Sequence, residues 1–131
     1  MKESPKTFFA PELLINSGVM ELDFYKNAFG AVELRRFSND DGSIHVSEMT
    51  IDGALFHFHE ERPDAGHLSP EHAKGITTII GLMVADVDAM MTRALAAGAT
   101  LRSPAQSYDY GYRQGQVIDP FGHVWQIEMV I

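Results

Sequence analysis

Two stretches of the chain alternate hydrophobic and polar residues in the same order. Residues 53–59 (GALFHFH) align with residues 122–128 (GHVWQIE), so that Phe56 corresponds to Trp125 and Phe58 to Ile127. At the positions between them, His57 corresponds to Gln126. Upstream, AFGAVELR (28–35) resembles AAGATLR (96–102) at nearly the same offset. Two copies of one supersecondary unit indicate an internal pseudo-twofold.

The first copy predicts a strand, a helix and three further strands. The strand covers 8–15 (FFAPELLI), and the helix runs from about 19 to 29, with Ser17 as its N-cap and Gly30 as a left-handed C-cap. The strings VELRRF, IHVSEMTI and ALFHFHE then read as strands. They are separated by two hairpin signals, Asp40-Asp41-Gly42 and Asp52-Gly53.

The second copy predicts the same order of elements. It begins with ITTIIGLMV, and a helix that starts after an N-cap at Asp86 ends at Gly98. Strands are expected near 99–103, 113–119 and 123–130. The chain therefore reads as a single α+β domain of two βαβββ units, with unit 1 at about 7–60 and unit 2 at about 76–131. The polar segment at about 61–75, rich in proline and glycine, is the predicted linker.

Composition narrows the classes of partner. The 131 residues are 45% hydrophobic but contain no apolar run of 18 residues, and MKESPKTFF has no apolar signal-peptide core. There is no cysteine, which excludes disulfides and thiolate chemistry, and a cytoplasmic location is the expectation. The net charge of −8 with scattered Lys and Arg argues against nucleic acid or a membrane surface as partner.

Three strings in order carry a resemblance to a known superfamily. They are FYKNAFGA, VADVDAMMTRALAAGA and YGYRQGQVIDPFGHVWQIE. With the duplicated βαβββ pattern, they resemble the vicinal-oxygen-chelate superfamily of glyoxalase I, extradiol dioxygenases and bleomycin-resistance proteins, and the third string is similar to its PhnB-like branch. The resemblance implies two half-barrels with helices outside, concave faces that enclose a ligand cavity, and a homodimer.

The same resemblance implies metal ligands on the first and last strand of each unit. Transferred by position, these fall on Ala10, His57, Ile80 and Gln126. Ala10 and Ile80 cannot coordinate a metal, and Gln126 is a weak donor, so we expect no metal and no other cofactor. Glu12, two residues from Ala10, is a conceivable substitute, and a divalent metal stays open as the alternative.

The alternation HFH places His57 and His59 on one face of their strand, and that face is expected to line the cavity. His57, as a general base, and Glu12 are the candidate catalytic residues. The candidate ligand-binding residues are His59, Gln126, Tyr108, Tyr110 and Arg113.

The string YDYGYR places three tyrosines and Arg113 within six residues, which suits a planar ligand with an anionic group. A structural role is equally open, in which Arg113 pairs with Asp109 or Asp119. His123 is expected to stabilise a turn at 119–123, and His67 and His72 to be solvated.

Two functions remain open. The first is a small-molecule-binding protein of the bleomycin-resistance type with a degenerate metal site and a cleft between the units. The alternative is a metal-dependent lyase, isomerase or dioxygenase of the vicinal-oxygen-chelate type. A protein that acts through its dimer surface is a third possibility, because this fold carries many functions.

Overall fold

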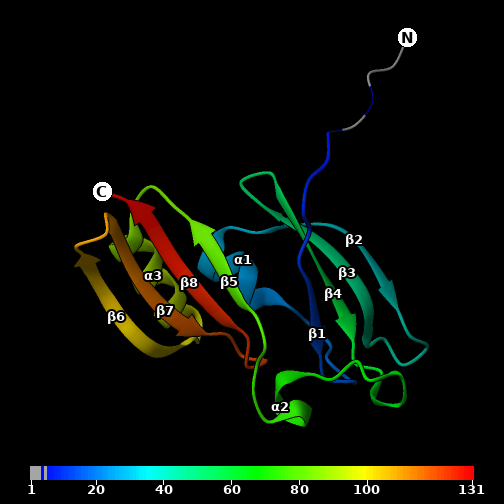
Figure 1. Cartoon of the computed structure of the whole chain (residues 1–131). Helices are drawn as coiled ribbons and strands as arrows, with labels where there is room; N and C mark the ends of the chain where they lie inside the picture. Colours follow the sequence, from blue (N-terminus) through cyan, green and yellow to red (C-terminus); the bar gives the residue numbers. More distant parts are fainter. Residues whose placement is uncertain (1–3, 5) are drawn as a thin grey trace.

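The chain folds into two four-stranded sheets, each formed by one unit (Figure 1). The computed structural model describes residue 4 and residues 6–131. Residues 1–3 and 5 of the N-terminal segment MKESPKTFF lie outside the described residues. Unit 1 contains β1 (Glu12–Ile15), α1 (Asp23–Phe29), β2 (Val32–Ser38), β3 (Ile44–Ile51) and β4 (Ala54–Glu60). Unit 2 contains β5 (Ile79–Met83), α3 (Val87–Ala97), β6 (Thr100–Tyr108), β7 (Tyr112–Ile118) and β8 (Val124–Val130).

The strand order repeats between the units and confirms the predicted duplication. Sheet 1 has the order β1-β4-β3-β2 and sheet 2 the order β5-β8-β7-β6. In both, the first strand pairs parallel with the last, and the other pairs are antiparallel. His57 faces Glu12 in the first parallel pair, and Gln126 faces Gly81 in the second.

Several predicted boundaries are wrong. The first strand begins at Glu12 rather than at residue 8, and the first helix begins at Asp23 without a side-chain cap, so Ser17 does not cap it. Gly30 adopts the predicted left-handed conformation (φ 69°), and Asp86 caps α3 by accepting from the Ala89 amide at 3.0 Å.

The segment between the units has structure of its own. It contains a 3₁₀ turn at Pro63–Ala65 and the short helix α2 (Pro70–Ala73), which Ser69 caps by accepting from the His72 amide at 3.3 Å. The buried carboxylate of Glu61 contacts His72 Nδ1 at 2.9 Å. His72 is therefore exposed but not free of protein partners.

Both sheets bury one face in the same hydrophobic core. Trp125 of β8 packs on Phe29 of α1 with ring centroids 4.9 Å apart and on Phe56 of β4 at 5.7 Å. Residues of both units form one hydrophobic core. Each sheet therefore has a back face on this shared core and a front face that turns away from it. The longest described helix, α3, has 11 residues, and no described helix is long and apolar enough to cross a membrane.

A buried carboxylate joins the units inside this core. Asp119 accepts from the Tyr25 hydroxyl of α1 at 2.6 Å and from Trp125 Nε1 at 3.0 Å, and it also accepts from the amides of Phe121 and His123. Burial first, and then the negative Asp119, raise the pKa of Tyr25 well above its ordinary value. The 119–123 turn is confirmed, and His123 contacts the Leu14 carbonyl of β1 at 2.7 Å.

Candidate functional site

A row of charged side chains crosses the front of sheet 1. Backbone pairing places Arg35, Glu48, His57 and Glu12 side by side on the four neighbouring strands. Arg35 donates to both carboxylate oxygens of Glu48, from Nη2 at 3.2 Å and from Nε. The hydrogen bond and the charge of Arg35 lower the pKa of Glu48. Glu48 is therefore an ionised carboxylate beside His57 at neutral pH.

His57 has unused hydrogen-bonding capacity on this face. Its side chain is 26% exposed, yet its Nε2 atom is buried and has no hydrogen-bond partner among the described residues. Glu48 Oε1 lies 3.7 Å away, beyond hydrogen-bonding distance. A buried polar atom without a partner costs roughly 1–3 kcal/mol, so this nitrogen favours a water molecule or a ligand group.

His59 lies one row further along the same face. Its Nδ1 is 2.6 Å from the Glu60 carbonyl, which assigns a proton to Nδ1 and leaves Nε2 as the acceptor in the neutral ring. A cavity of about 300 Å³ opens beside the ring. Its lining residues are Glu12, Leu14, His59, Arg62 and His67.

The front of sheet 2 carries amides and a carboxylate in the equivalent rows. Gln116 Nε2 donates to Gln126 Oε1 at 2.8 Å, and Gln126 Nε2 donates to Glu128 Oε1 at 3.1 Å. Gln114 Nε2 donates to the same carboxylate oxygen at 2.7 Å. Gln126, the counterpart of His57, is thus part of a continuous hydrogen-bonded chain.

Three tyrosines lie at one end of this hydrogen-bonded network of glutamines and Glu128. The rings of Tyr108 and Tyr110 stack with centroids 5.2 Å apart, and Tyr112 lies 6.0 Å from Tyr110. The Tyr110 hydroxyl donates to Gln114, which links the aromatic cluster to the network around Glu128. Desolvation first, and then the nearby Tyr108 and Glu128, raise the pKa of Tyr110.

Arg113 is held by the helix behind the sheet. Its Nε and Nη2 donate to the two carboxylate oxygens of Asp88 in α3 at 2.9 and 2.7 Å, and its Nη1 donates to Ser107 at 3.2 Å. The predicted structural partners, Asp109 and Asp119, are therefore wrong. Direct binding of a ligand by Arg113 on the front face would require this ion pair to open.

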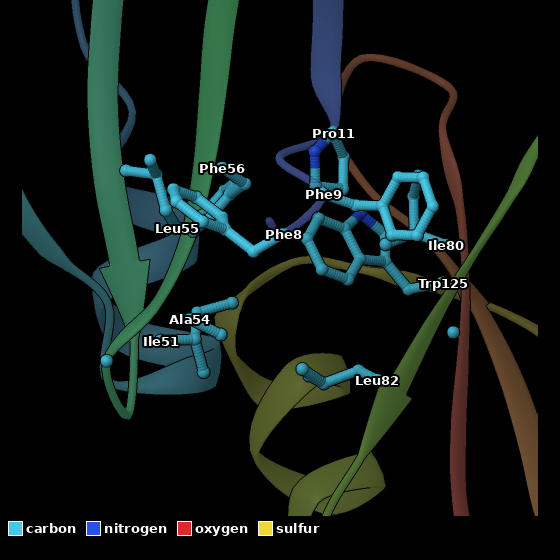
Figure 2. A pocket seen from close by; sticks show the side chains of 12 residues that line it. Phe8, Phe9, Pro11, Ile51, Ala54, Leu55, Phe56, Ile80, Leu82 and Trp125 are labelled. Carbon is cyan, nitrogen blue, oxygen red and sulfur yellow. The ribbon is translucent and has the colours of Figure 1, made fainter. Parts of the chain in front are cut away.

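The cavity between the units has a different lining from the one predicted. It has a volume of about 530 Å³ and lies under the N-terminal segment (Figure 2). Apolar side chains dominate its wall, among them Phe8, Phe9, Leu55, Phe56, Ile80, Leu82 and Trp125. His57, His59 and Gln126 do not line this cavity, because their sheet faces turn away from the shared core.

The residues of one chain do not fit the metal that the resemblance implies. Ile80 packs against the hydrophobic core, and the position that faces Gln126 is Gly81, which has no donor. On sheet 1, the Glu48 carboxylate beside His57 is bound to Arg35. Among residue 4 and residues 6–131, no three His, Asp or Glu side chains form a metal-binding group.

Comparison with known proteins identifies the family. The model of the Glyoxalase/Bleomycin resistance protein/Dioxygenase superfamily matches residues 20–127. The chain belongs to this superfamily. The uncharacterized protein Rv0887c of Mycobacterium tuberculosis is 36% identical to it over 121 residues, which cover 90% of this chain and 71% of the relative. The uncharacterized protein Mb0911c of Mycobacterium bovis is also 36% identical, with 80% of its length covered.

Solved structures share the fold. A gene product of Arabidopsis thaliana is 26% identical, with a TM-score of 0.68 over 94% of this chain and 98% of that one. TioX from Micromonospora sp. ML1 is 24% identical, with a TM-score of 0.69 over 95% and 97% of the two chains. The fosfomycin resistance protein FosX of Listeria monocytogenes is 17% identical, with a TM-score of 0.67 over 98% and 96%. TioX and FosX support the fold alone.

Sequence reasoning missed the partners of the predicted residues. Glu48 and Arg35 beside His57, and Gln114 near Gln126, were not among the candidates. The repeat aligns Glu128 with His59, but Glu128 was assigned no role. The alternation of apolar and polar residues within IHVSEMTI and VWQIEMV predicts which face of its strand carries Glu48 and which carries Glu128. The residues that lie next to them on neighbouring strands depend on the strand register.

Proposed function

We propose that this chain is a small-molecule-binding protein that works as a homodimer. A small organic ligand is held between the front of sheet 1 of one copy and the front of sheet 2 of the other. The observation that carries the proposal is that the predicted polar residues other than Arg113 lie on two faces that both turn away from the shared core. A second copy can bring the two faces opposite each other, which one chain does not do.

Exposed apolar residues support an interface between copies. Phe9 is 96% exposed and Phe8 66%, and both lie at the apolar cavity beside the edge strands β1 and β5. Ile79 and Met83 of β5 and Val130 of β8 are also largely exposed. Large apolar side chains gathered near free strand edges favour association, and closed twofold dimers are the commonest assembly.

In this proposal each face has its own task. His57 offers its unpartnered Nε2 to the ligand, with Glu12 and His59 beside it, and Gln126 and the tyrosines contact the ligand from the other copy. The string YGYRQGQVIDPFGHVWQIE is the basis for placing the chain in the PhnB-like branch.

An enzyme is the second candidate, and His57 is the observation that favours it. An imidazole beside an ionised Glu48 is suited to take a proton from a bound substrate. We derive no step through a metal, because the donor set of one chain does not fit one.

The first test is the mass in solution. Light scattering at high micromolar concentration is expected to give twice the chain mass, and a monomer mass would refute the shared site. Thermal-shift screening of a compound library that includes bleomycin and fosfomycin then supplies a binder for the second test.

The second test mixes two inactive variants. His57→Ala and Gln126→Ala are each expected to lose binding of that compound. If the site is shared, random mixed dimers restore about a quarter of the sites, because each heterodimer has one intact site. A mixture with no binding would instead place His57 and Gln126 in one site of the same chain, or in no common site.

A further inference from the structure

Glu128 differs from the other half-buried carboxylates of the chain in having no cation beside it. The side chains of Glu33, Glu48 and Glu60 are 19%, 18% and 19% exposed, and each has an arginine or histidine partner. None of the ion pairs formed within residues 4 and 6–131 includes Glu128.

The hydrogen bonds around Glu128 leave part of the carboxylate unused. Gln114 and Gln126 both donate to Oε1. Oε2 lies over Gly81, where a Cβ atom would come within 2.8 Å of it. The missing side chain at Gly81 therefore leaves room for the carboxylate against the sheet.

Aromatic rings adjoin this carboxylate. Tyr112 faces Val130 in the strand pair, and Gln114 faces Glu128 one row away, so the tyrosine row and Glu128 share the front face. Tyr108 pairs with Tyr112 and stacks on Tyr110, which is 63% exposed. Tyrosine faces attract cations, and they do so more strongly where water is excluded.

We propose that the front of sheet 2 binds the cationic group of a small organic ligand, with Glu128 as its counter-charge and the Tyr108–Tyr110–Tyr112 cluster as its aromatic wall. This inference rests on the proposed function and names the ligand class for half of that site. The net charge of −8 favours approach of a cation, and the amide donors of Gln114, Gln116 and Gln126 are engaged within the network rather than offered to an anion.

Three probes of one ring size test the charge preference: benzyltrimethylammonium, benzyl alcohol and benzoate. Titrations are followed by the amide NMR shifts of the front of sheet 2. We expect the cation to bind there about tenfold more tightly than benzyl alcohol, and benzoate not to bind. Equal affinity for the cation and the alcohol, a preference for benzoate, or no binding of any probe would overturn the inference.

Two variants assign the effect to residues. Glu128→Gln keeps the shape of the side chain and is expected to weaken the cation about tenfold while leaving benzyl alcohol unchanged. Tyr110→Leu is expected to weaken the cation several-fold. Glu71→Gln in α2 is the matched control, because it removes one carboxylate far from this face in the sequence and outside the network. Circular dichroism confirms that each variant is folded.

The outcomes separate this inference from the proposed function. Cation affinity that survives Glu128→Gln refutes the role of Glu128, while mixed His57→Ala and Gln126→Ala dimers still decide whether the site is shared. A monomeric protein that binds the cation only at Glu128 and the tyrosines would refute the shared site and keep the cation subsite.

Discussion

Asp119→Asn is expected to destabilise the protein because it leaves the buried indole N–H of Trp125 without a hydrogen-bond acceptor. The carboxylate is 4% exposed and accepts four hydrogen bonds. Oδ1 accepts from the amides of Phe121 and His123, and Oδ2 accepts from the Tyr25 hydroxyl and Trp125 Nε1. Asparagine has one acceptor oxygen and an amide group that only donates.

The magnitude follows from which donors the asparagine can still satisfy. With its oxygen toward the two backbone amides, its NH₂ group faces Tyr25 and Trp125. The Tyr25 hydroxyl can rotate and accept, but the indole N–H only donates and is left unpaired. Trp125 is 1% exposed, so water does not replace the lost partner, and the cost is about 1–3 kcal/mol. The opposite amide orientation would leave two backbone donors unpaired.

A double-mutant cycle with Trp125→Phe isolates this cost. In the phenylalanine background the indole donor is gone, so Asp119→Asn should cost about 1–2 kcal/mol less than in the native chain. Urea unfolding at one fixed protein concentration, followed by far-ultraviolet circular dichroism, measures all four proteins. Fluorescence is unsuitable, because Trp125 is the one tryptophan.

Asp109→Asn is the control, because it removes the same negative charge as Asp119→Asn but from an exposed side chain. A cost below about 0.5 kcal/mol for Asp119→Asn, near the effect of an ordinary surface change, would refute the reasoning. An equal cost in both backgrounds would show that the indole hydrogen bond does not carry the effect.

Three further outcomes are expected. The pKa of Tyr25 is raised in the folded state, so its contribution to stability is complete below the unfolded pKa near 10 and falls as the pH rises above that value. The free energy of unfolding, measured between about pH 9 and 11, should therefore fall less steeply with pH in Tyr25→Phe than in the native protein. Gly115→Ala should lower the free energy of unfolding by about 1–3 kcal/mol in urea titrations, because the new Cβ would lie 2.8 Å from Met91 Cε and 3.2 Å from the Ala105 backbone. Gly53→Ala is the comparison: its Cβ would meet no atom within 4 Å, so this variant reports backbone strain alone. Metal analysis of protein purified without added metal should find well under one equivalent per chain, and about one equivalent that is lost in His57→Ala would favour the enzyme over the binding protein.

Local signals predicted most elements because their causes are local. Asp86 and Gly98 define the ends of α3, and Gly30 ends α1, through caps that involve only neighbouring backbone groups. The Ser69-Pro70 pair, an N-cap followed by proline at the first helical position, was also a readable signal for α2, but the proline and glycine content of the segment indicated a loop.

Boundaries that depend on a distant partner were predicted poorly. Residues 8–11 have strand-like composition, but parallel pairing with β4 begins only at Glu12 opposite His57. Residues 19–22 suit a helical face, yet the helix begins at Asp23; the amide of Ile44 donates to the Val19 carbonyl at 2.8 Å, which ties this segment to β3 instead.

The sequence by itself determined which residues share a face of each strand, because side chains alternate with a period of two and the repeat aligns His57 with Gln126. Only the tertiary structure decided what those faces meet. Both sheets bury their apolar sides in one core with residues of α1 and α3, so the polar sides turn outward instead of closing on each other. Register between strands placed Glu48 beside His57 and Glu128 over Gly81, and register depends on long-range pairing that no single segment specifies.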